Sequence, residues 1–190
     1  MPDTLLEQHA EALRLFGGYV RAIADDQWAA PTPCTEWNVR ELVNHVTGEQ
    51  RWIPPLVTDG RTVEDVGDEL SGDLLGADPV AAWDRAAAAA HAAFTASGAL
   101  DRTVRLSYGP ALGSAYCSEL TADCVVHAWD LARAIGADDR LPDSLVEFSI
   151  KEVMPYADGL AASGAYAPPV EIQAGADAQT RLLALVGRRG

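Results

Sequence analysis

The pattern of hydrophobic and polar positions along the chain is mainly helical. Apolar residues recur at three- and four-residue steps from about residue 5 to residue 28, which predicts an amphipathic helix. Residues 31–33 contain two prolines, which favour extended or turn backbone. A second helix is expected from Asn38, which can form a capping box with Glu41, to about Pro54.

The pattern continues with a loop and two further helices. An acidic, glycine-bearing stretch over residues 58–76 predicts a loop. Asp78 and Pro79 are typical of an N-cap and a first turn, so we expect a third helix through the alanine-rich run to residue 95. A fourth helix is predicted over residues 114–135, ending at Gly136.

Between the third and fourth helices, residues 103–106 have the β-branched character of a short strand, which residues 108–110 should break. A fifth helix is expected over residues 143–163, with a kink at Pro155. A short extended stretch at residues 170–172 then precedes a final helix over residues 178–186.

These elements predict an all-α fold, in which four long helices form an up-down bundle. An additional C-terminal helix and a short extended tail complete it. We expect a single helical domain over residues 1–190, with the bundle at about 3–163 and the tail at 164–190.

The charge of the chain narrows the classes of partner. The formal net charge is -14 and the pI is near 4.5, which argues against binding nucleic acid or an anionic membrane. Small molecules or proteins remain, and a homodimer is one candidate assembly. The three cysteines are an odd number without a disulfide pattern, and we find no signal peptide or membrane-spanning stretch. The expected location is therefore cytoplasmic.

The fourth helix carries the most informative spacing. Asp123 precedes His127 by four residues, so both side chains lie on one helical face, as metal ligands often do. That face is a narrow polar sector, which is either a solvated surface or a polar seam inside the bundle. The sector comprises Glu119, Asp123, His127, Asp130 and Arg133.

The second helix offers a partner for this pair. His45 and Glu49 lie on its apolar face, so His45 should point into the core. Alone, such a histidine is more often a hydrogen-bonded core residue than a ligand. Together with Asp123 and His127, however, it supplies the three protein ligands of an open metal site. Glu49 is the alternative carboxylate.

Three segments resemble one known family: residues 31–46, 126–133 and 181–188. They are similar to actinobacterial proteins of the DinB-like, mycothiol-dependent maleylpyruvate isomerase N-terminal family, and the resemblance covers nearly the whole chain. It implies a DinB-like bundle with a divalent metal held by one histidine on the second helix and a pair of ligands four residues apart on a later helix. His45 and His127 match the two histidines.

The third ligand departs from the family pattern. The resemblance implies a glutamate or a histidine there, whereas this chain has Asp123, whose shorter arm needs a closer approach or a bridging water. Asp130 is a candidate acceptor for an imidazole N–H, although a plain salt bridge to Arg133 or another arginine is equally consistent with its position.

The chemistry that the resemblance implies is the activation of a small thiol. Mycothiol would be the co-substrate and a small electrophile the substrate, in thiol transfer or thiol-assisted isomerisation. Maleylpyruvate itself is less expected, because the resembled isomerase has an additional C-terminal domain. Zinc is the default metal, and nickel, iron and manganese accept the same ligands. A non-catalytic metal- or small-ligand-binding bundle, acting as a sensor or carrier, is the alternative.

Other residues have weaker signals. Trp52 is the tryptophan expected to meet a bound cofactor. Cys34 is either a small buried residue or a soft ligand or nucleophile near the site. His9 should be a core histidine that could line the pocket, and His91 has no acidic partner at ligand spacing.

Overall fold

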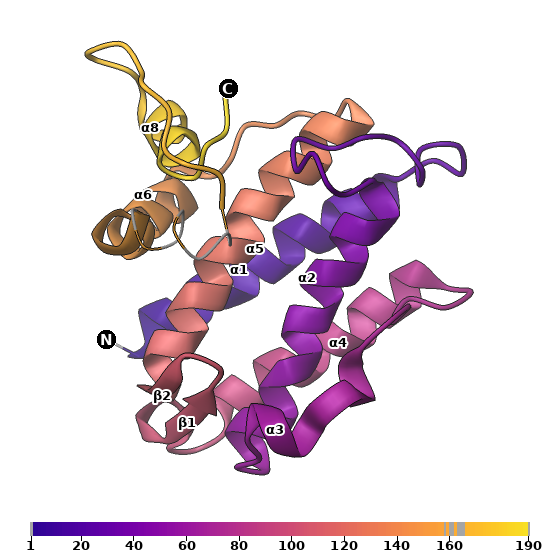
Figure 1. Cartoon of the computed structure of the whole chain (residues 1–190), viewed down its shortest axis with the longest axis vertical. Helices are drawn as coiled ribbons and strands as arrows, with labels where there is room; N and C mark the ends of the chain where they lie inside the picture. The colour runs from indigo at the N-terminus through magenta and orange to yellow at the C-terminus, as the bar shows by residue number, and fades with distance from the viewer. Residues whose placement is uncertain (1, 158, 160–161, 163–165, 190) are drawn as a thin grey trace.

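Four long helices form an antiparallel bundle in the computed structural model, which describes residues 2–157, 159, 162 and 166–189. Each of α1 and α2 packs against both α4 and α5, and α6 and α8 lie together beside α5 (Figure 1). The all-α prediction is confirmed. These helices are α1 Pro2–Ala22, α2 Val39–Ile53, α4 Pro79–Thr95, α5 Gly113–Ile135, α6 Asp143–Val153 and α8 Ala178–Leu185.

The predicted helix ends are largely confirmed. Asn38 caps α2 in a capping box with Glu41, and Asp78 caps α4 by accepting a hydrogen bond from Ala81 N–H. Gly136 ends α5 with a φ of 69°, in the left-handed region that favours glycine. These ends fix where α2 and α5 place their polar side chains.

The first helix is shorter than predicted. It ends at Ala22 rather than near residue 28. The Gln27 side chain accepts a hydrogen bond from Ala24 N–H at 2.9 Å and donates one to the carbonyl of Ile135 at 3.0 Å. These bonds replace another helical turn with a turn that is tied to the end of α5.

The predicted loop at residues 58–76 contains short helices, which the sequence analysis missed. Five residues of π-helix, Pro54–Thr58, extend α2, and α3 Val63–Val66 and the 3-10 turn Gly67–Leu70 follow. Thr62 caps α3 through a capping box with Asp65. Such short local hydrogen-bonded turns leave little periodicity for a pattern to detect.

The predicted strand is present, but it is half of a hairpin. β1 Thr103–Leu106 pairs with β2 Gly109–Leu112, in which Arg105 lies opposite Pro110. Proline was expected to end the strand here. A two-stranded sheet has only edge strands, so the missing N–H of Pro110 does not prevent pairing.

The C-terminal part follows the prediction in outline. α6 gives way at Met154–Tyr156 to a 3-10 turn around Pro155, as expected from the missing N–H of proline. The end of the predicted helix, up to residue 163, lies partly outside the described residues. Residues 170–172 belong to no strand of the described chain, and the N–H of Val170 donates instead to the carbonyl of Ala184 in α8.

The buried apolar residues form two clusters with polar residues between them. On α1, His9 lies between Leu6 of one cluster and Ala12 of the other. On α5, Thr121 lies in the same way between Leu120 and Ala122. His9 and Thr121 are fully buried and hydrogen-bonded at 3.2 Å. On α2, Thr47 and Gln50 take the corresponding place and are also fully buried. The bundle therefore has a polar layer near the middle of its core.

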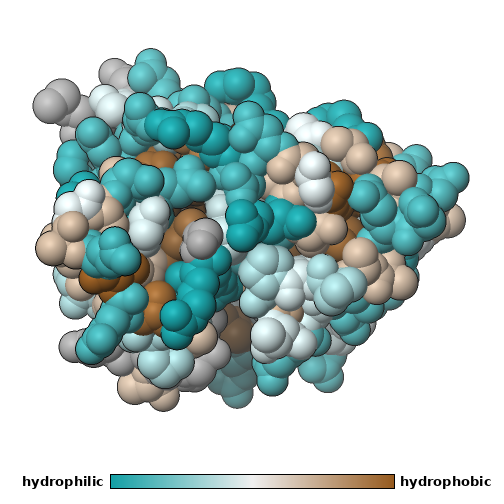
Figure 2. Space-filling model, turned by 90° about the horizontal axis from the view of Figure 1, so that it is seen from above, coloured by the Kyte–Doolittle hydropathy of each residue, from teal (hydrophilic) through white to brown (hydrophobic). Residues whose placement is uncertain are grey.

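One face of the molecule is mostly polar. Seen from above, hydrophilic residues cover most of the face, and hydrophobic ones show mainly in hollows between them (Figure 2). Among the helices that the structure describes, none is both long and apolar enough to cross a membrane.

Replacing His9 with glutamine should reduce the acid sensitivity of the fold. Burial, aided by His91, lowers the pKa of His9 from 6.5 to about 4. The unfolded chain therefore binds a proton that the folded chain resists, and wild-type stability falls as pH drops from 6.5 to 4. At about 1.4 kcal/mol per pKa unit, this difference contributes about 2–3 kcal/mol. Urea unfolding at pH 7 and pH 4 should show this additional loss in wild type relative to His9→Gln. Equal losses in both proteins would contradict it.

Candidate metal centre

The structure brings His45, Asp123 and His127 together. Helix α2 contributes the first, and α5 contributes the other two from successive turns. One potential ligand atom from each residue lies within 4.8 Å of the others. The ring centroids of His45 and His127 are 5.2 Å apart, in an edge-to-face arrangement. The polar sector of α5 is therefore a seam that faces α2 at this level.

The geometry of this group suits a divalent cation. His127 Nε2 lies 3.4 Å from Asp123 Oδ1. Two ligands of a tetrahedral zinc, each about 2.0–2.1 Å from the metal, are about 3.4 Å apart. The other oxygen of Asp123, Oδ2, is buried and has no hydrogen-bond partner among the described residues. A buried carboxylate oxygen without a donor is costly unless a cation satisfies it, so these residues fit a metal.

The pKa values of the three side chains are shifted in different directions. Burial lowers the pKa of His45, which keeps its imidazole neutral and able to ligate. Burial alone would raise the pKa of the Asp123 carboxyl, but His127 and His45 outweigh that effect and lower it. Conversely, Asp123 and Asp130 overcome the burial of His127 and raise its pKa. The side chains of this partly buried group thus influence one another's protonation.

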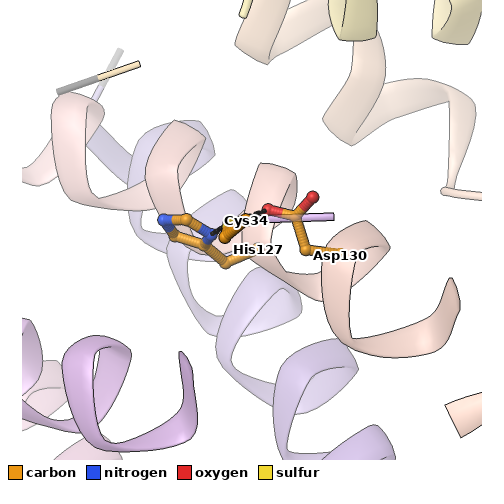
Figure 3. A group of neighbouring side chains, drawn as sticks. All are labelled: Cys34, His127 and Asp130. Atoms are coloured by element: carbon orange, nitrogen blue, oxygen red, sulfur yellow. Dashed lines mark hydrogen bonds and ion pairs between the residues drawn. The ribbon is translucent and has the colours of Figure 1, made fainter. Parts of the chain in front are cut away.

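The other edge of the His127 ring is held by a second group. His127 Nδ1 donates to Asp130 Oδ2 at 2.9 Å, which leaves Nε2 free to face Asp123. The thiol of Cys34 lies 3.1 Å from the same Asp130 oxygen and 3.7 Å from His127 Nδ1. Figure 3 shows these three side chains next to one another. Asp130 is thus placed to accept a hydrogen bond from Nδ1 of His127.

Arg188 completes this second group from the C-terminal end of the chain. Its Nη2 donates to Asp130 Oδ2 and to Cys34 Sγ, both at 2.9 Å, and its Nε donates to Asp130 Oδ1 at 3.2 Å. Asp130 is fully buried, and burial is outweighed by His127 and Arg188, which lower its pKa. The alternative of a salt bridge to an arginine is thus also present, whereas Arg133 pairs with Asp139 instead.

Two groups of residues in the described chain could hold a metal: Cys34, His127 and Asp130, or His45, Asp123 and His127. In the first group, the guanidinium of Arg188 already supplies the positive charge that the carboxylate needs. A second cation there would be repelled by the guanidinium. Among the described residues, the second group has an unpartnered oxygen and no lysine or arginine paired with it, so it is the better candidate.

The solvent side of this centre has an acidic and an aromatic wall. The side chains of His45 and Asp123 are 29% and 22% exposed, against 5% for His127. Glu49 Oε1 lies 4.0 Å from His45 Nδ1, and burial together with Asp123 raises the pKa of Glu49 to about 7. Trp37 packs on His45 with its ring 4.4 Å away. The centre is therefore accessible from the His45 side.

Some residues around the centre were missed by sequence reasoning. Tyr166 donates its hydroxyl to Asp123 Oδ1 at 2.6 Å, and no spacing could have indicated this contact. Arg188 lies in the C-terminal motif, which was given no chemical role. Trp37 falls inside the first motif and contacts His45. Trp52 packs against the second apolar cluster, and its role in cofactor binding stays a prediction.

The remaining histidines lie away from the candidate ligands. His9 is a core residue that is hydrogen-bonded to Thr121, and its ring stacks at 6.0 Å on that of His91. His91 therefore has an aromatic partner inside the bundle, which its sequence position did not suggest. Cys34 is half-buried, and its thiol contacts Asp130. It therefore lies near the site, as the expectation of a ligand or nucleophile requires.

Comparison with known proteins agrees with this picture. The family model described as the mycothiol maleylpyruvate isomerase N-terminal domain matches residues 9–132, which include all three candidate ligands. An uncharacterized protein of Mycobacterium tuberculosis, from two strains, is 35% identical over 152 residues, covering 75% of this chain and 74% of the relative. A crystal structure of a histidine-to-alanine mutant of the mycothiol-dependent maleylpyruvate isomerase has a similar fold, with a TM-score of 0.63 at 13% identity. That match covers 84% of this chain and 72% of the isomerase.

Proposed function

Since the chain belongs to the mycothiol maleylpyruvate isomerase N-terminal domain family, we propose that it binds a divalent metal and uses a small thiol, mycothiol, in a transfer or isomerisation reaction on a small electrophile. The observation that carries the proposal is the group of His45, Asp123 and His127, with its unpartnered carboxylate oxygen. We assign the metal to these three residues, with zinc as the first choice and nickel, iron or manganese as alternatives.

A bound divalent cation would lower the pKa of a coordinated thiol, so that the thiolate forms at neutral pH. Around it, the residues of the chain have distinct tasks. Asp130 accepts the Nδ1 proton of His127 and so directs Nε2 toward the centre. Trp37 packs on the partly buried His45 ring and restricts its orientation. These contacts fix the two histidines before any ligand arrives.

Glu49 is placed to receive the proton that an incoming thiol loses, because its carboxylate lies 4.0 Å from His45 on the accessible side. It also stays the alternative ligand to Asp123. The thiolate would then form a sulfur–carbon bond with the electrophile. In a transferase that bond persists and the electrophile takes up a proton or releases a leaving group, whereas in an isomerase the same bond breaks again and the thiol is recovered.

The reaction can be tested with the zinc-loaded protein. We expect it to bind mycothiol in calorimetry and to accelerate the loss of mycothiol in the presence of a bimane, or the conversion of maleylpyruvate with mycothiol present. The variant Glu49→Gln should retain zinc and react more slowly, because its amide cannot take up a proton.

Two outcomes would contradict the thiol-dependent reaction. Protein with a full zinc content that neither binds mycothiol nor consumes it would be a metal-binding bundle without this activity, such as a sensor or carrier. Turnover of an ester or amide substrate in the absence of thiol would instead indicate metal-assisted hydrolysis.

A further inference from the structure

Asp123 is the carboxylate among the three candidate ligands, and each of its oxygens has a distinct environment. Its Oδ1 lies 3.4 Å from His127 Nε2 and accepts a hydrogen bond from the Tyr166 hydroxyl at 2.6 Å. Its Oδ2 is buried without a partner in the described part of the chain. The Tyr166 hydrogen bond therefore decides how the two oxygens are arranged about the centre.

Tyr166 is itself held in place by contacts with both groups around His127. Its ring stacks on the His127 ring, with 6.2 Å between centroids and 22° between planes. The guanidinium carbon of Arg188 lies over the same Tyr166 ring, 5.3 Å from its centroid. Arg188 is in turn fixed by its ion pair with Asp130. A residue outside the long helices thus has a defined position against the ligands.

We propose that Tyr166 is a positioning residue that makes Asp123 an effective metal ligand, so that the C-terminal segment of residues 166–188 is part of the metal centre. An aspartate has one rotatable bond fewer than a glutamate and reaches less far from the helix. A hydrogen bond from a fixed phenol holds its carboxylate at the required place and leaves one lone pair of Oδ1 and all of Oδ2 for the cation. This inference rests on the proposed metal site.

The segment and the metal should therefore stabilise each other. If docking of residues 166–188 orients Asp123, zinc binding must favour the docked segment by the same factor, because coupling between two equilibria is reciprocal. We expect zinc to slow hydrogen exchange in this segment. A metal site independent of the segment would leave its exchange rate unchanged.

The decisive variant is Tyr166→Phe, which removes only the hydroxyl. We expect zinc affinity, measured by competition with a chromogenic chelator, to fall by about 10–100-fold, the effect usual for a partner of a metal ligand. The visible spectrum of the cobalt-loaded variant should also change, because the carboxylate is free to rotate. Circular dichroism in EDTA should match that of wild type, since the phenyl ring retains its packing and the fold is kept.

Tyr19→Phe is the matched control. Its hydroxyl donates at 2.7 Å to the carbonyl of Asp138, at an exposed position outside the ligand group, so its zinc affinity and cobalt spectrum should equal those of wild type. A second variant separates positioning from general packing. In Asp123→Glu, the longer arm should depend less on the phenol, so adding Tyr166→Phe should weaken zinc binding by less than it does in wild type.

The outcomes distinguish this inference from the proposed function. Tight zinc binding by wild type and equally tight binding by Tyr166→Phe would overturn the positioning role and leave the metal centre intact. Failure of wild type itself to bind zinc would overturn the metal centre and the positioning role together. An equal loss of affinity in the Asp123→Glu background would show that the hydroxyl acts through packing instead of through Asp123.

Discussion

Replacing His127 or His45 with alanine is expected to weaken zinc binding by more than about 100-fold. Structural zinc sites bind with about 10–16 kcal/mol shared among some four ligands, so the loss of one ligand should cost about 3 kcal/mol. The effect should be larger for His127, which lies between both polar groups and is 5% exposed. Elemental analysis after dialysis, together with chelator competition, would measure it.

His91→Ala is the control for this result. His91 lies on α4 and contacts His9 instead of the three candidate ligands. It should therefore keep the metal content of wild type. Full metal occupancy in both His45→Ala and His127→Ala would show that the metal is held elsewhere, and circular dichroism of each variant would establish that its fold is retained.

Replacing Arg188 with methionine is expected to lower the free energy of unfolding by about 3–5 kcal/mol. The change removes the guanidinium that donates to both oxygens of the Asp130 carboxylate, and Asp130 is 0% exposed. Breaking a buried ion pair on one side is costly because the remaining charge stays desolvated. Urea unfolding of the metal-free protein, monitored by circular dichroism, would measure this loss.

The comparison is an exposed ion pair made by Arg133, which lies on α5 like Asp130. Arg133 pairs with Asp139 at 2.8 Å, with side chains 47% and 29% exposed. Arg133→Met should therefore cost less than about 1 kcal/mol. In the Asp130→Asn background, which lacks the buried carboxylate, Arg188→Met should also cost much less than in wild type. A loss under 1 kcal/mol for Arg188→Met alone would mean that Asp130 is neutral or solvated in the folded chain.

The long helices could be predicted from sequence because their determinants are local. Asn38 with Glu41, Asp78 with Pro79, and Gly136 each act on hydrogen bonds within a few residues. The early end of α1 could not be predicted, because Gln27 is fixed by the carbonyl of Ile135 on another helix. The hairpin partner of β1 was also missed, since Pro110 is tolerated only in the context of an edge strand.

The candidate site divides in the same way. Helical periodicity placed Asp123 beside His127 and turned His45 toward the core, because a regular helix converts spacing into direction. The polar sector of α5 could have been a solvated surface or a seam inside the bundle. Only the packing of α2 against α5 decided between these two interpretations. The contacts of Tyr166 and Arg188 span 43 and 58 residues of sequence, respectively. No repeat or spacing relates such residues, so only the folded chain brings them together.

Local rules of helix formation therefore predicted the long helices, the face of α2 that carries His45 and the face of α5 that Asp123 shares with His127. Only the tertiary structure shows that the two nitrogens of His127 have different surroundings. Nε2 faces Asp123 and His45, whereas Nδ1 lies against Asp130 and Cys34, which Arg188 holds. The physical reason is that backbone hydrogen bonds and side-chain periodicity act over one or two turns, whereas burial and electrostatic pairing depend on which distant segments share the same interior.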